Sequence, residues 1–516
     1  MPIPVLSPEQ SSAWDRAAEA AGIGLATLME SAGRAVATAI CARYGDRLQQ
    51  GVIVATGIGN NGGDGWVAAR VLHQAGIPVW VAPLPGAGSE LERKMAGLAH
   101  AAGVRQVGPD GPWPNAGLLV DALLGTGAKG APREPVAALV ARLQDLDLPI
   151  VAIDGPTGLD LATGVSYLPT RADLSITFGG PRRGHLLARD EIGTLLVADI
   201  GHPGPSPEWP FLVTDRLAAE WLPRLRADDH KGSRGRVVVI GGNAGMTGAV
   251  RIASRAAFAA GAGLVHAVAP ADTVVALVTA EPDLQTLGHE IRLPLSAELD
   301  TLLKRADAVV IGPGLGRAPG TADFVLEVLH RVRSAVVDAD ALTVLQGKVK
   351  ELRESGAGRS LVLTPHTGEF HSLFPERAQS LEADPWSAAS DAADQSGVTV
   401  LLKGVPTVVA RTGRNIHTIA AGNPGLATGG SGDLLSGLVG AALARGVEPE
   451  VAAALGAQVL GRAADLAARR SSARSLRPMD VIAALPDLWR AWEVMRIAPP
   501  LVRPPFLLEL EQPQTY

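Results

Sequence analysis

The sequence predicts an α/β protein of two domains. Its 516 residues are more than a single hydrophobic core usually organises. In both halves, short apolar runs typical of buried strands alternate with Ala- and Leu-rich stretches of helical spacing. Hydrophobic residues make up 47% of the chain and aromatic residues only 4%, so we expect cores built mainly from Ala, Val, Leu and Ile.

The first half predicts a parallel sheet covered on both faces, because helical stretches separate its continuous apolar strands. The expected strands are Gly51–Thr56, Pro78–Ala82, Leu118–Asp121 and Pro149–Asp154. The expected helices are Pro8–Ala21, Leu25–Arg43, Trp66–Ala75, Glu90–Ala102 and Pro135–Leu143.

A second α/β pattern follows the proline-rich stretch Gly201–Pro210, which we interpret as the interdomain linker. Its expected strands are Gly235–Ile240, Gly263–Val268, Ala308–Ile311, Ala335–Asp338, Ser360–Leu363 and Thr399–Leu402. Three helices, at Gly430–Leu443, Pro449–Ala468 and Pro478–Met495, are expected to close the domain. We expect the proline-rich tail Pro499–Tyr516 to be loosely held.

Composition argues against several classes of partner. The net charge is -6 and no basic run is longer than Arg182-Arg183, so we expect no nucleic acid. We find no apolar run of transmembrane length and no signal-peptide pattern, and we therefore expect a cytoplasmic protein that binds no membrane. The single cysteine, Cys41, excludes an internal disulfide and a cysteine metal cluster. It lies in an Ala-rich helical stretch and is interpreted as a small core residue.

The most informative motif is the glycine-rich run from Gly422 to Asp433 (GNPGLATGGSGD), which precedes an apolar stretch of helical spacing. Backbone N–H groups at such a helix start, together with the helix dipole, favour anions and phosphates in particular. Asp433 is then placed to deprotonate a hydroxyl that attacks phosphorus. The competing interpretation is a tight loop that ends in an Asp cap.

Three further loops in the first half combine glycines with acids at strand ends. They are Gly57–Gly65 (GIGNNGGDG), Asp121–Gly127 (DALLGTG) and Asp154–Asp160 (DGPTGLD). Ligands of open α/β sheets bind beyond the carboxyl ends of strands, so we expect the loops to converge on one pocket. Amides, carbonyls and carboxylates there suit a phosphate-bearing ligand or a hard cation.

This loop set, with Leu28–Gly33 (LMESAG), closely resembles the NAD(P)H-hydrate epimerases, the YjeF N-terminal family, over residues 1–215. The resemblance implies a Rossmann-like three-layer α/β/α domain. It also implies a site for the hydrated nucleotide at Asn60, Asn61, Gly62, Gly63, Asp64, Gly125, Thr126, Gly127, Ala128, Lys129, Gly130, Ala131 and Asp154. A potassium site is implied at Asn61, Asp121 and Thr157, where the family usually has Ser at the last position. We assign proton transfer to Asp154 as a hypothesis.

The second half carries an ordered series of motifs before the glycine–aspartate run. They are His230–Gly232, Gly235–Gly242, Gly248-Ala249, Gly261–Gly263, Gly312–Gly316, Thr364–Glu369 (TPHTGE) and Lys403-Gly404. Their order resembles the ADP-dependent NAD(P)H-hydrate dehydratases of the ribokinase-like superfamily, over residues 225–498.

That resemblance implies contacts to the hydrated nucleotide from Ala249, Gly314, His366 and Asp433. It implies ADP contacts from Lys403, Gly404, Val405, Pro406, Thr407 and Gly432, with magnesium accompanying the nucleotide. The run Glu281-Pro282-Asp283 departs from the Pro-Glu expected there. We interpret Asp338 and Asp340 as turn and cap residues. Alone, His366 would be a capping or core residue, and Lys403 could equally be a solvated charge.

Together the motifs predict a bifunctional repair enzyme that forms homo-oligomers. Its first domain would interconvert the R and S forms of hydrated NADH and NADPH. Its second would dehydrate the S form with ADP, giving AMP and phosphate, because transfer of a phosphoryl group turns hydroxide into a better leaving group. Two alternatives stay open: a small-molecule kinase of the ribokinase type, and a first domain that binds without catalysing.

Overall fold

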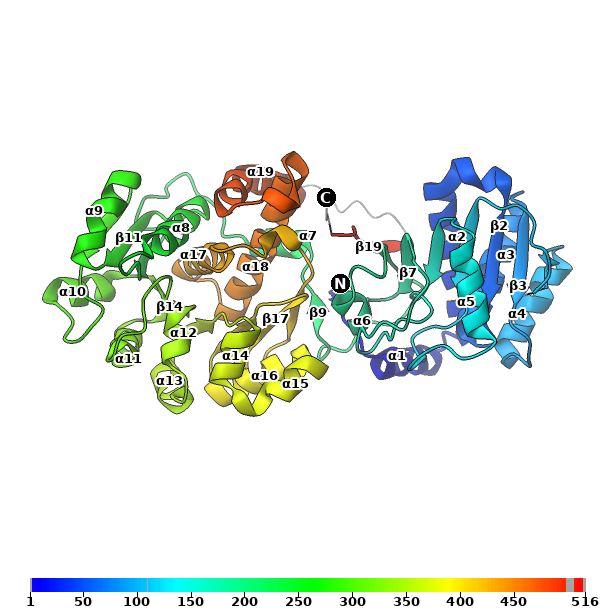
Figure 1. Cartoon of the computed structure of the whole chain (residues 1–516), viewed down its shortest axis with the longest axis horizontal. Coiled ribbons are helices and arrows are strands. Elements are labelled where there is room, and N and C mark those ends of the chain that lie inside the picture. Colours follow the sequence, from blue (N-terminus) through cyan, green and yellow to red (C-terminus); the bar gives the residue numbers. More distant parts are fainter. Residues whose placement is uncertain (1, 109, 498–504, 514–516) are drawn as a thin grey trace. The chain divides into compact units, whose positions relative to one another are not determined.

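The computed structural model describes residues 2–108, 110–497 and 505–513, and the chain forms two compact units (Figure 1). The first unit comprises residues 1–209 with 501–513, and the second comprises residues 210–500 with 514–516. Both are α/β, which confirms the predicted fold class.

The first unit is built on a sheet in the order β19-β8-β7-β6-β5-β2-β3-β4. All neighbouring strands are parallel except β19, which is antiparallel to β8. The strands are β2 Val52–Thr56, β3 Val79–Pro83, β4 Arg105–Gln106, β5 Leu118–Ala122, β6 Ile150–Ile153, β7 Leu174–Phe178, β8 Thr194–Ala198 and β19 Phe506–Leu510. A two-residue strand, β1, spans Ile3–Pro4.

The helices of this unit cover both faces of the sheet (Figure 1). They are α1 Pro8–Ala20, α2 Leu25–Tyr44, α3 Asn60–Gln74, α4 Glu90–Ala101, α5 Val136–Asp145 and α6 Arg183–Leu187. Side chains alternate along β2, so Val52 and Val54 pack in the core with α2, α3 and α4, whereas Ile53 and Ala55 pack in the core with α5. Local signals start α1: Ser7 and Gln10 form a capping box around Pro8.

The second unit contains strands in the order β9-β18-β17-β16-β15-β14-β13-β10-β11-β12. The pairs β16–β17 and β17–β18 are antiparallel, and the remaining pairs are parallel. The strands are β9 Phe211–Leu212, β10 Arg236–Ile240, β11 Leu264–Ala269, β12 Gln285–Gly288, β13 Ala308–Ile311, β14 Ser334–Val337, β15 Ser360–Leu363, β16 Thr399–Leu402, β17 Thr407–Ala410 and β18 His417–Ile419.

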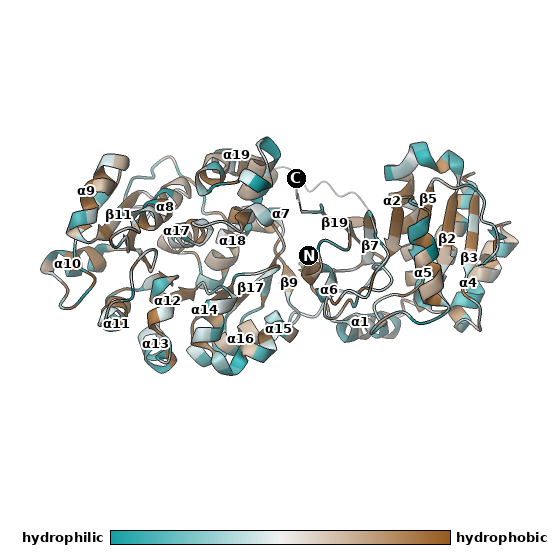
Figure 2. Cartoon of the chain, viewed as in Figure 1, coloured by the Kyte–Doolittle hydropathy of each residue, from teal (hydrophilic) through white to brown (hydrophobic). Residues whose placement is uncertain are grey.

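One face of this sheet packs against α8, α17 and α18, α19 packs on α7, α8 and α18, and α16 packs on β16 and β17. The helices are α7 Asp215–Trp221, α8 Thr247–Ala259, α9 Ala271–Ala280, α10 Ala297–Arg305, α11 Thr321–Arg331, α12 Asp340–Val344, α13 Val349–Gly356, α14 Thr367–Leu373, α15 Ala378–Ala383, α16 Pro385–Ser396, α17 Ser431–Ala444, α18 Pro449–Arg470 and α19 Pro478–Ile497. The strands are hydrophobic in both units, whereas outer helices such as α13 and α16 carry hydrophilic residues (Figure 2).

Two expectations about the first unit need correction. Helix α3 begins at Asn60, so most of the GNNGGDG motif is helical and not a loop. Its glycines serve close packing: a Cβ on Gly62 would lie 1.9 Å from the carbonyl oxygen of Gly57, and one on Gly63 would lie 2.5 Å from the sulfur of Met29. Cys41 is exposed and is not a core residue, because it lies on the outer side of α2.

The tail is also more ordered than expected. Residues 505–513 include the strand β19, whose pairing with β8 the proline-rich sequence did not reveal. The rest of the predicted loose tail, residues 499–504 and 514–516, lies outside the described residues.

Among the described residues, one helix, α18, is long and apolar enough to cross a membrane by length and composition. This corrects the expectation that no stretch of this kind is present. Because 78% of its apolar window is buried inside the protein, α18 has the character of a core helix.

Two helical glycines test how packing and helix propensity compete. A Cβ on Gly97 in α4 would meet nothing within 4 Å, so Gly97→Ala should stabilise the first unit by about 1 kcal/mol. A Cβ on Gly437 in α17 would lie 2.2 Å from the carbonyl oxygen of Ala253 in α8, so Gly437→Ala should destabilise the second unit by roughly 1–3 kcal/mol. Urea unfolding of each variant measures both, and destabilisation by Gly97→Ala would contradict the argument.

Candidate active sites

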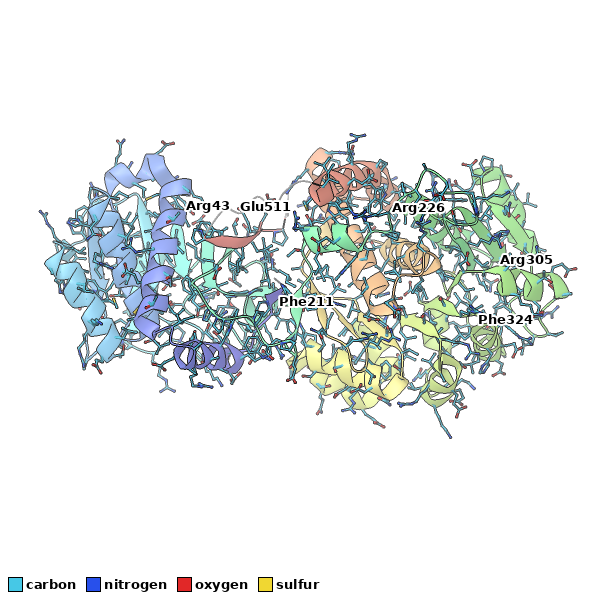
Figure 3. The ribbon with its side chains drawn as sticks, turned by 180° about the vertical axis from the view of Figure 1, so that it is seen from behind. Arg43, Phe211, Arg226, Arg305, Phe324 and Glu511 are labelled. Carbon is cyan, nitrogen blue, oxygen red and sulfur yellow. The ribbon has the colours of Figure 1, made fainter. Side chains whose placement is uncertain are left out.

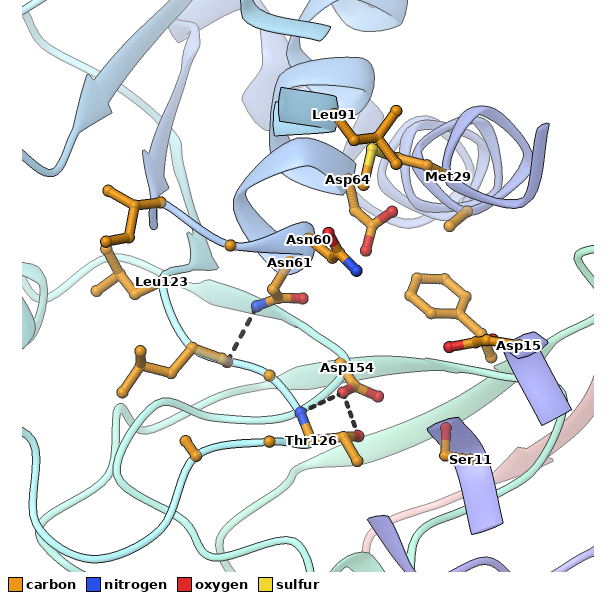
Figure 4. Close-up of a pocket in the computed structure, with 18 of the residues that line it drawn as sticks. Ser11, Asp15, Met29, Asn60, Asn61, Asp64, Leu91, Leu123, Thr126 and Asp154 are labelled. Carbon is orange, nitrogen blue, oxygen red and sulfur yellow. Dashed lines mark hydrogen bonds between the residues drawn. The ribbon is translucent and has the colours of Figure 1, made fainter. Parts of the chain in front are cut away.

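Three loops of the first unit meet at the carboxyl edge of its sheet. β2, β5 and β6 are adjacent and parallel, so the loops that follow them lie side by side. The amide of Gly57 donates to the carbonyl oxygen of Ala122 at 2.9 Å and joins the first loop to the second. The loops border a cavity of about 660 Å³ (Figure 4).

Most residues that the sequence assigned to the hydrated-nucleotide site line this cavity. Those that line it are Asn60, Asn61, Asp64, Gly125, Thr126, Gly127, Ala128 and Asp154. Gly62 and Gly63 are buried in the packing of α3. Lys129, Gly130 and Ala131 are exposed and are not part of the lining.

Asp154 is held by donors from three elements. Its Oδ2 accepts hydrogen bonds from the amide of Thr126, at 2.7 Å, and from the Thr126 hydroxyl (Figure 4). Its Oδ1 accepts from the hydroxyl of Thr177 at 3.0 Å and lies 3.5 Å from the guanidinium of Arg182. The backbone φ of Asp154 is 65°, a left-handed conformation that is strained for a non-glycine residue and recurs at functional sites.

Electrostatics keep Asp154 ionised. Burial opposes the charge, but Arg182 and the Thr126 donors outweigh it and hold the pKa of Asp154 below its ordinary value. His185 lies behind it, with Nε2 2.7 Å from the carbonyl oxygen of Asp154 and Nδ1 accepting from the amide of Arg182. Burial lowers the pKa of His185 to about 4, so this imidazole is neutral at pH 7.

The carboxyl group of Asp64, which also lines the cavity, has its pKa shifted in the opposite direction. Burial, and then the charges of Asp154 and Asp15, raise the pKa of Asp64 well above its ordinary value. The cavity therefore pairs a carboxylate stabilised by a cation with a carboxyl group that favours its protonated form. Such a difference between neighbouring carboxyls suits acid–base chemistry.

Sequence reasoning missed several lining residues. They include Ser11 and Asp15 of α1, Phe178, Arg182 and His202. His202 lies in the stretch interpreted as a linker, and there it stacks on Trp14 with ring centroids 4.4 Å apart. Arg182 lies four residues after β7 and immediately before α6, and a charged residue so close to a strand end was a signal available in the sequence.

The implied potassium ligands also cluster. Asp121 is fully buried and accepts hydrogen bonds from the amide and hydroxyl of Thr157, both at 2.8 Å. Asn61 donates to the carbonyl oxygen of Leu124, whose amide donates to the Thr157 hydroxyl at 3.1 Å. The Oδ1 of Asn61 is a buried acceptor without a hydrogen-bond partner among the described residues. An oxygen acceptor left over in this way fits a hard cation.

In the second unit, the glycine–aspartate run leads into the start of α17. Gly430 precedes the helix with φ 94°, a conformation open to glycine, and no side chain caps the first amides. Asp433 is the third residue of the helix. Close packing holds this end in place, since a Cβ on Gly430 would lie 2.9 Å from Ile252 in α8.

A buried ion pair lies against this helix start. Lys403, directly after β16, places Nζ 3.0 Å from Oδ1 of Asp338 and 3.5 Å from Oε2 of Glu369. The Ser436 hydroxyl of α17 donates to the other oxygen of Asp338 at 2.6 Å. Burial disfavours the charged ammonium, but the carboxylates of Asp338 and Glu369 outweigh it and raise the pKa of Lys403. Lys403 is therefore not a solvated charge.

Asp338 corrects the interpretation as a turn residue. It follows β14 directly and is 1% exposed, so it brings a carboxylate into the site as Asp121 and Asp154 do in the first unit. Asp340 begins α12 and accepts from the amide of Gly316 at 2.9 Å, which is a structural role. The position of Asp338 at a strand end was the signal that the sequence offered.

Asp433 has the chemistry of a base near neutral pH. Its pKa is raised to about 6, first by burial and then by the charge of Asp338, while Lys403 opposes the shift. A carboxylate of this pKa is ionised at pH 7 and binds a proton more readily than an ordinary Asp.

The other predicted residues of this site fall into four groups. Ala249 and Gly314 adjoin, since a Cβ on Gly314 would lie 3.3 Å from that of Ala249. His366 caps α14, with Nδ1 accepting from the amides of Gly368 and Glu369, and its side chain is exposed. Gly432 lies beside Lys403, since its Cβ would be 3.5 Å from Nζ. Gly404, Val405 and Pro406 lie in the turn between β16 and β17, and Thr407 is the first residue of β17.

The departure at Glu281 has a structural explanation. Its carboxylate pairs with Arg251 at 2.6 Å and with Arg255 at 2.9 Å, both on α8. The residue therefore joins the end of α9 to α8.

Two protein families match the chain, one in each half. Residues 25–184 match the family described as YjeF-related protein N-terminus, and residues 237–487 match the family described as NAD(P)H-hydrate dehydratase.

Curated relatives match almost the whole chain. The bifunctional NAD(P)H-hydrate repair enzyme Nnr of Moorella thermoacetica is 38% identical, over 90% of this chain and 92% of its own length. The enzyme of the same name from Escherichia coli is 35% identical, over 91% and 90% respectively. Among solved structures, an ADP/ATP-dependent NAD(P)H-hydrate dehydratase from Bacillus subtilis is 24% identical with a TM-score of 0.48, over 54% of this chain and 97% of its own.

The raised pKa of Asp433 makes stability depend on pH. The folded state binds the proton of Asp433 more tightly than the unfolded chain does. The contribution of this proton to the free energy of unfolding is therefore fully present below about pH 4 and is lost as the pH rises through about 6. Asp433→Asn should therefore stabilise the second unit by about 1–3 kcal/mol at pH 7.5 and confer little advantage at pH 4. Urea unfolding at both values measures this, with the exposed Asp323→Asn as control. An equal effect of Asp433→Asn at the two pH values would contradict the shift.

Proposed function

We propose a division of chemistry within this chain, which belongs to the family of bifunctional NAD(P)H-hydrate repair enzymes. Membership establishes the two activities, epimerisation and dehydration of hydrated NAD(P)H. The dependence of the dehydration on a nucleotide is part of our proposal. In our proposal residues 1–215 carry the epimerase and residues 225–498 carry the dehydratase. The observation that carries it is the Asp433 carboxyl at an uncapped helix start beside Lys403.

In the dehydratase, Asp433 accepts the proton of the substrate hydroxyl as that oxygen attacks the terminal phosphorus of ADP. AMP leaves, and the first amides of α17 with the Lys403 ammonium stabilise charge on the phosphoryl oxygens. The ring nitrogen then expels phosphate as the C–O bond breaks, and loss of a proton from the neighbouring carbon gives NAD(P)H. Ala249, Gly314 and His366 are proposed to hold the hydrated nucleotide.

The segment from Gly404 to Thr407, with Lys403 and Gly432, is proposed to hold the adenine nucleotide. Magnesium fits the buried carboxylate of Asp338 and the half-buried carboxylate of Asp433, since this ion binds through one or two carboxylates and substrate phosphates and retains waters. It would neutralise phosphate charge. Among the described residues, no cluster of three or more His, Cys, Asp or Glu could hold a metal alone.

In the epimerase, Asp64 gives a proton to the departing hydroxyl while the ring nitrogen forms the cationic iminium. Asp154, ionised beside Arg182, stabilises that cation and accepts a proton from the water that adds to the opposite face. Exchange with solvent then resets both carboxyls. Asn60, Asn61 and the loop from Gly125 to Ala128 are proposed to hold the nucleotide.

Potassium fits the first site because the Asn61 Oδ1 acceptor is unpaired among the described residues. The Thr157 hydroxyl would be its second ligand, and Asp121 would supply the buried negative charge, since its own lone pairs already accept hydrogen bonds. The ion would bring positive charge to the phosphates of the substrate. ADP as the preferred nucleotide, assembly into homo-oligomers and a cytoplasmic location stay predictions.

The dehydratase proposal is tested with Asp433→Asn. With S-hydrated NADH, ADP and magnesium, the variant should lose about 10²–10⁴-fold in the rate at which reduced-nicotinamide absorbance returns. In the parent, the rate should rise as pH passes through about 6 and be flat above. Epimerisation by the same sample is the internal control. Phosphorylated product without water loss would instead favour a kinase.

The epimerase proposal is tested with Asp154→Asn and a mixture of both forms of hydrated NADH. The variant should consume the S form at the parental rate and then stall, because the R form no longer converts. Asp145→Asn, at an exposed position of α5, is the matched control. Readings must precede spontaneous epimerisation. A parent that stalls as the variant does would favour a first unit that binds without catalysing.

A further inference from the structure

The last described segment of the chain is a strand of the first unit. β19 runs antiparallel to β8, with Phe506 opposite Ala198, Leu508 opposite Val197 and Leu510 opposite Leu195. Phe506 packs against the core formed with α2, α3 and α4. Leu510 is 6% exposed, whereas Leu507 in the same strand is 47% exposed. The segment therefore buries one face and covers an edge that would otherwise expose unpaired backbone groups.

Specific contacts hold this segment at both ends. The amide of Asp199 donates to the carbonyl oxygen of Pro505 at 2.6 Å. At the other end, the Arg189 guanidinium donates to the carbonyl oxygen of Glu511 at 2.5 Å. Arg43 of α2 pairs with Glu509 at 2.6 Å, and Figure 3 shows Arg43 and Glu511 beside the strand. Contacts from α2 and from the segment after α6 thus fix the position of β19 on the sheet.

Strand β8, whose edge β19 covers, leads directly to the cavity of the first unit. Ile200 and His202, which follow β8, line that cavity, and so does Phe178 at the end of the neighbouring strand β7. The hydroxyl of Thr177 in β7 donates to Asp154. Order in β8 thus bears on one wall of the epimerase site.

We infer that the β8 edge is an interaction surface whose partner is the chain's own C-terminal segment, residues 505–513, and that the epimerase site depends on it. Along the sequence this segment is far from the first unit, since it comes after residue 487, where the match to the dehydratase family ends. The functional part of this inference rests on the proposed epimerase role of the first unit. The binding part does not.

The experiment compares the full chain with Leu510→Asp, with a form that ends at Pro504, and with Leu507→Asp as the matched control. Hydrogen exchange of the β8 amides, Thr194–Ala198, is measured together with both activities. In the first two variants, β8 exchange should become at least about tenfold faster and epimerase activity should fall several-fold, while the dehydratase rate is unchanged. Leu507→Asp should match the parent in all three measurements.

A synthetic peptide of residues 505–513, added to the shortened form, should restore β8 protection and epimerase activity. Unchanged β8 exchange in the shortened form, or equal effects of Leu510→Asp and Leu507→Asp, would overturn the inference. A peptide that fails to restore protection would also overturn it. If β8 exchange responds as expected but the parent shows no epimerase activity, the binding of residues 505–513 to β8 is supported, whereas the proposed function of the first unit is wrong.

Discussion

Parallel pairing of strands is the constraint on which both sites depend. Parallel neighbours end at the same edge of a sheet, so residues that follow different strands are brought together whatever their distance in the sequence. In the first unit this places Asp121 and Asp154 beside the start of α3. In the second it places Asp338 after β14 and Lys403 after β16 against α17. Each sheet thus gathers buried charge at one edge, where a helix begins.

Neighbouring charges then divide the carboxyls into chemical roles. Asp154 lies beside Arg182 and keeps its charge, whereas Asp64 in the same cavity has its pKa raised by burial and by other carboxylates. Asp433 is intermediate, because Lys403 partly offsets the effects of burial and of Asp338. All three are aspartates in glycine-rich sequence, so their residue type does not separate them. What separates them is the distance to a cation that comes from another element of the fold.

Where sequence and structure differ, packing between elements is the cause. The glycines of the GNNGGDG motif indicate a loop by propensity, yet Gly62 and Gly63 are helical. They serve close packing, since Gly57 and Met29 leave no room for a Cβ. The stretch Gly201–Pro210 has the composition of a linker, but His202 stacks on Trp14 and lines the first cavity. The family membership, supported by relatives that match about nine-tenths of the chain, sets aside the kinase alternative.

The sequence by itself determined the α/β class, many of the parallel strands in each half, and the glycine-rich motifs that carry Asp121, Asp154 and Asp433. These features depend on local hydrophobic periodicity and on the positions of glycines, both of which can be recognised from the sequence alone. Only the tertiary structure decided that Asp338 is buried against Lys403, that Arg182 sets the charge of Asp154, and that residues 506–510 complete the first sheet. Each of these contacts joins residues from separate elements, and local sequence patterns do not predict which distant residues come together.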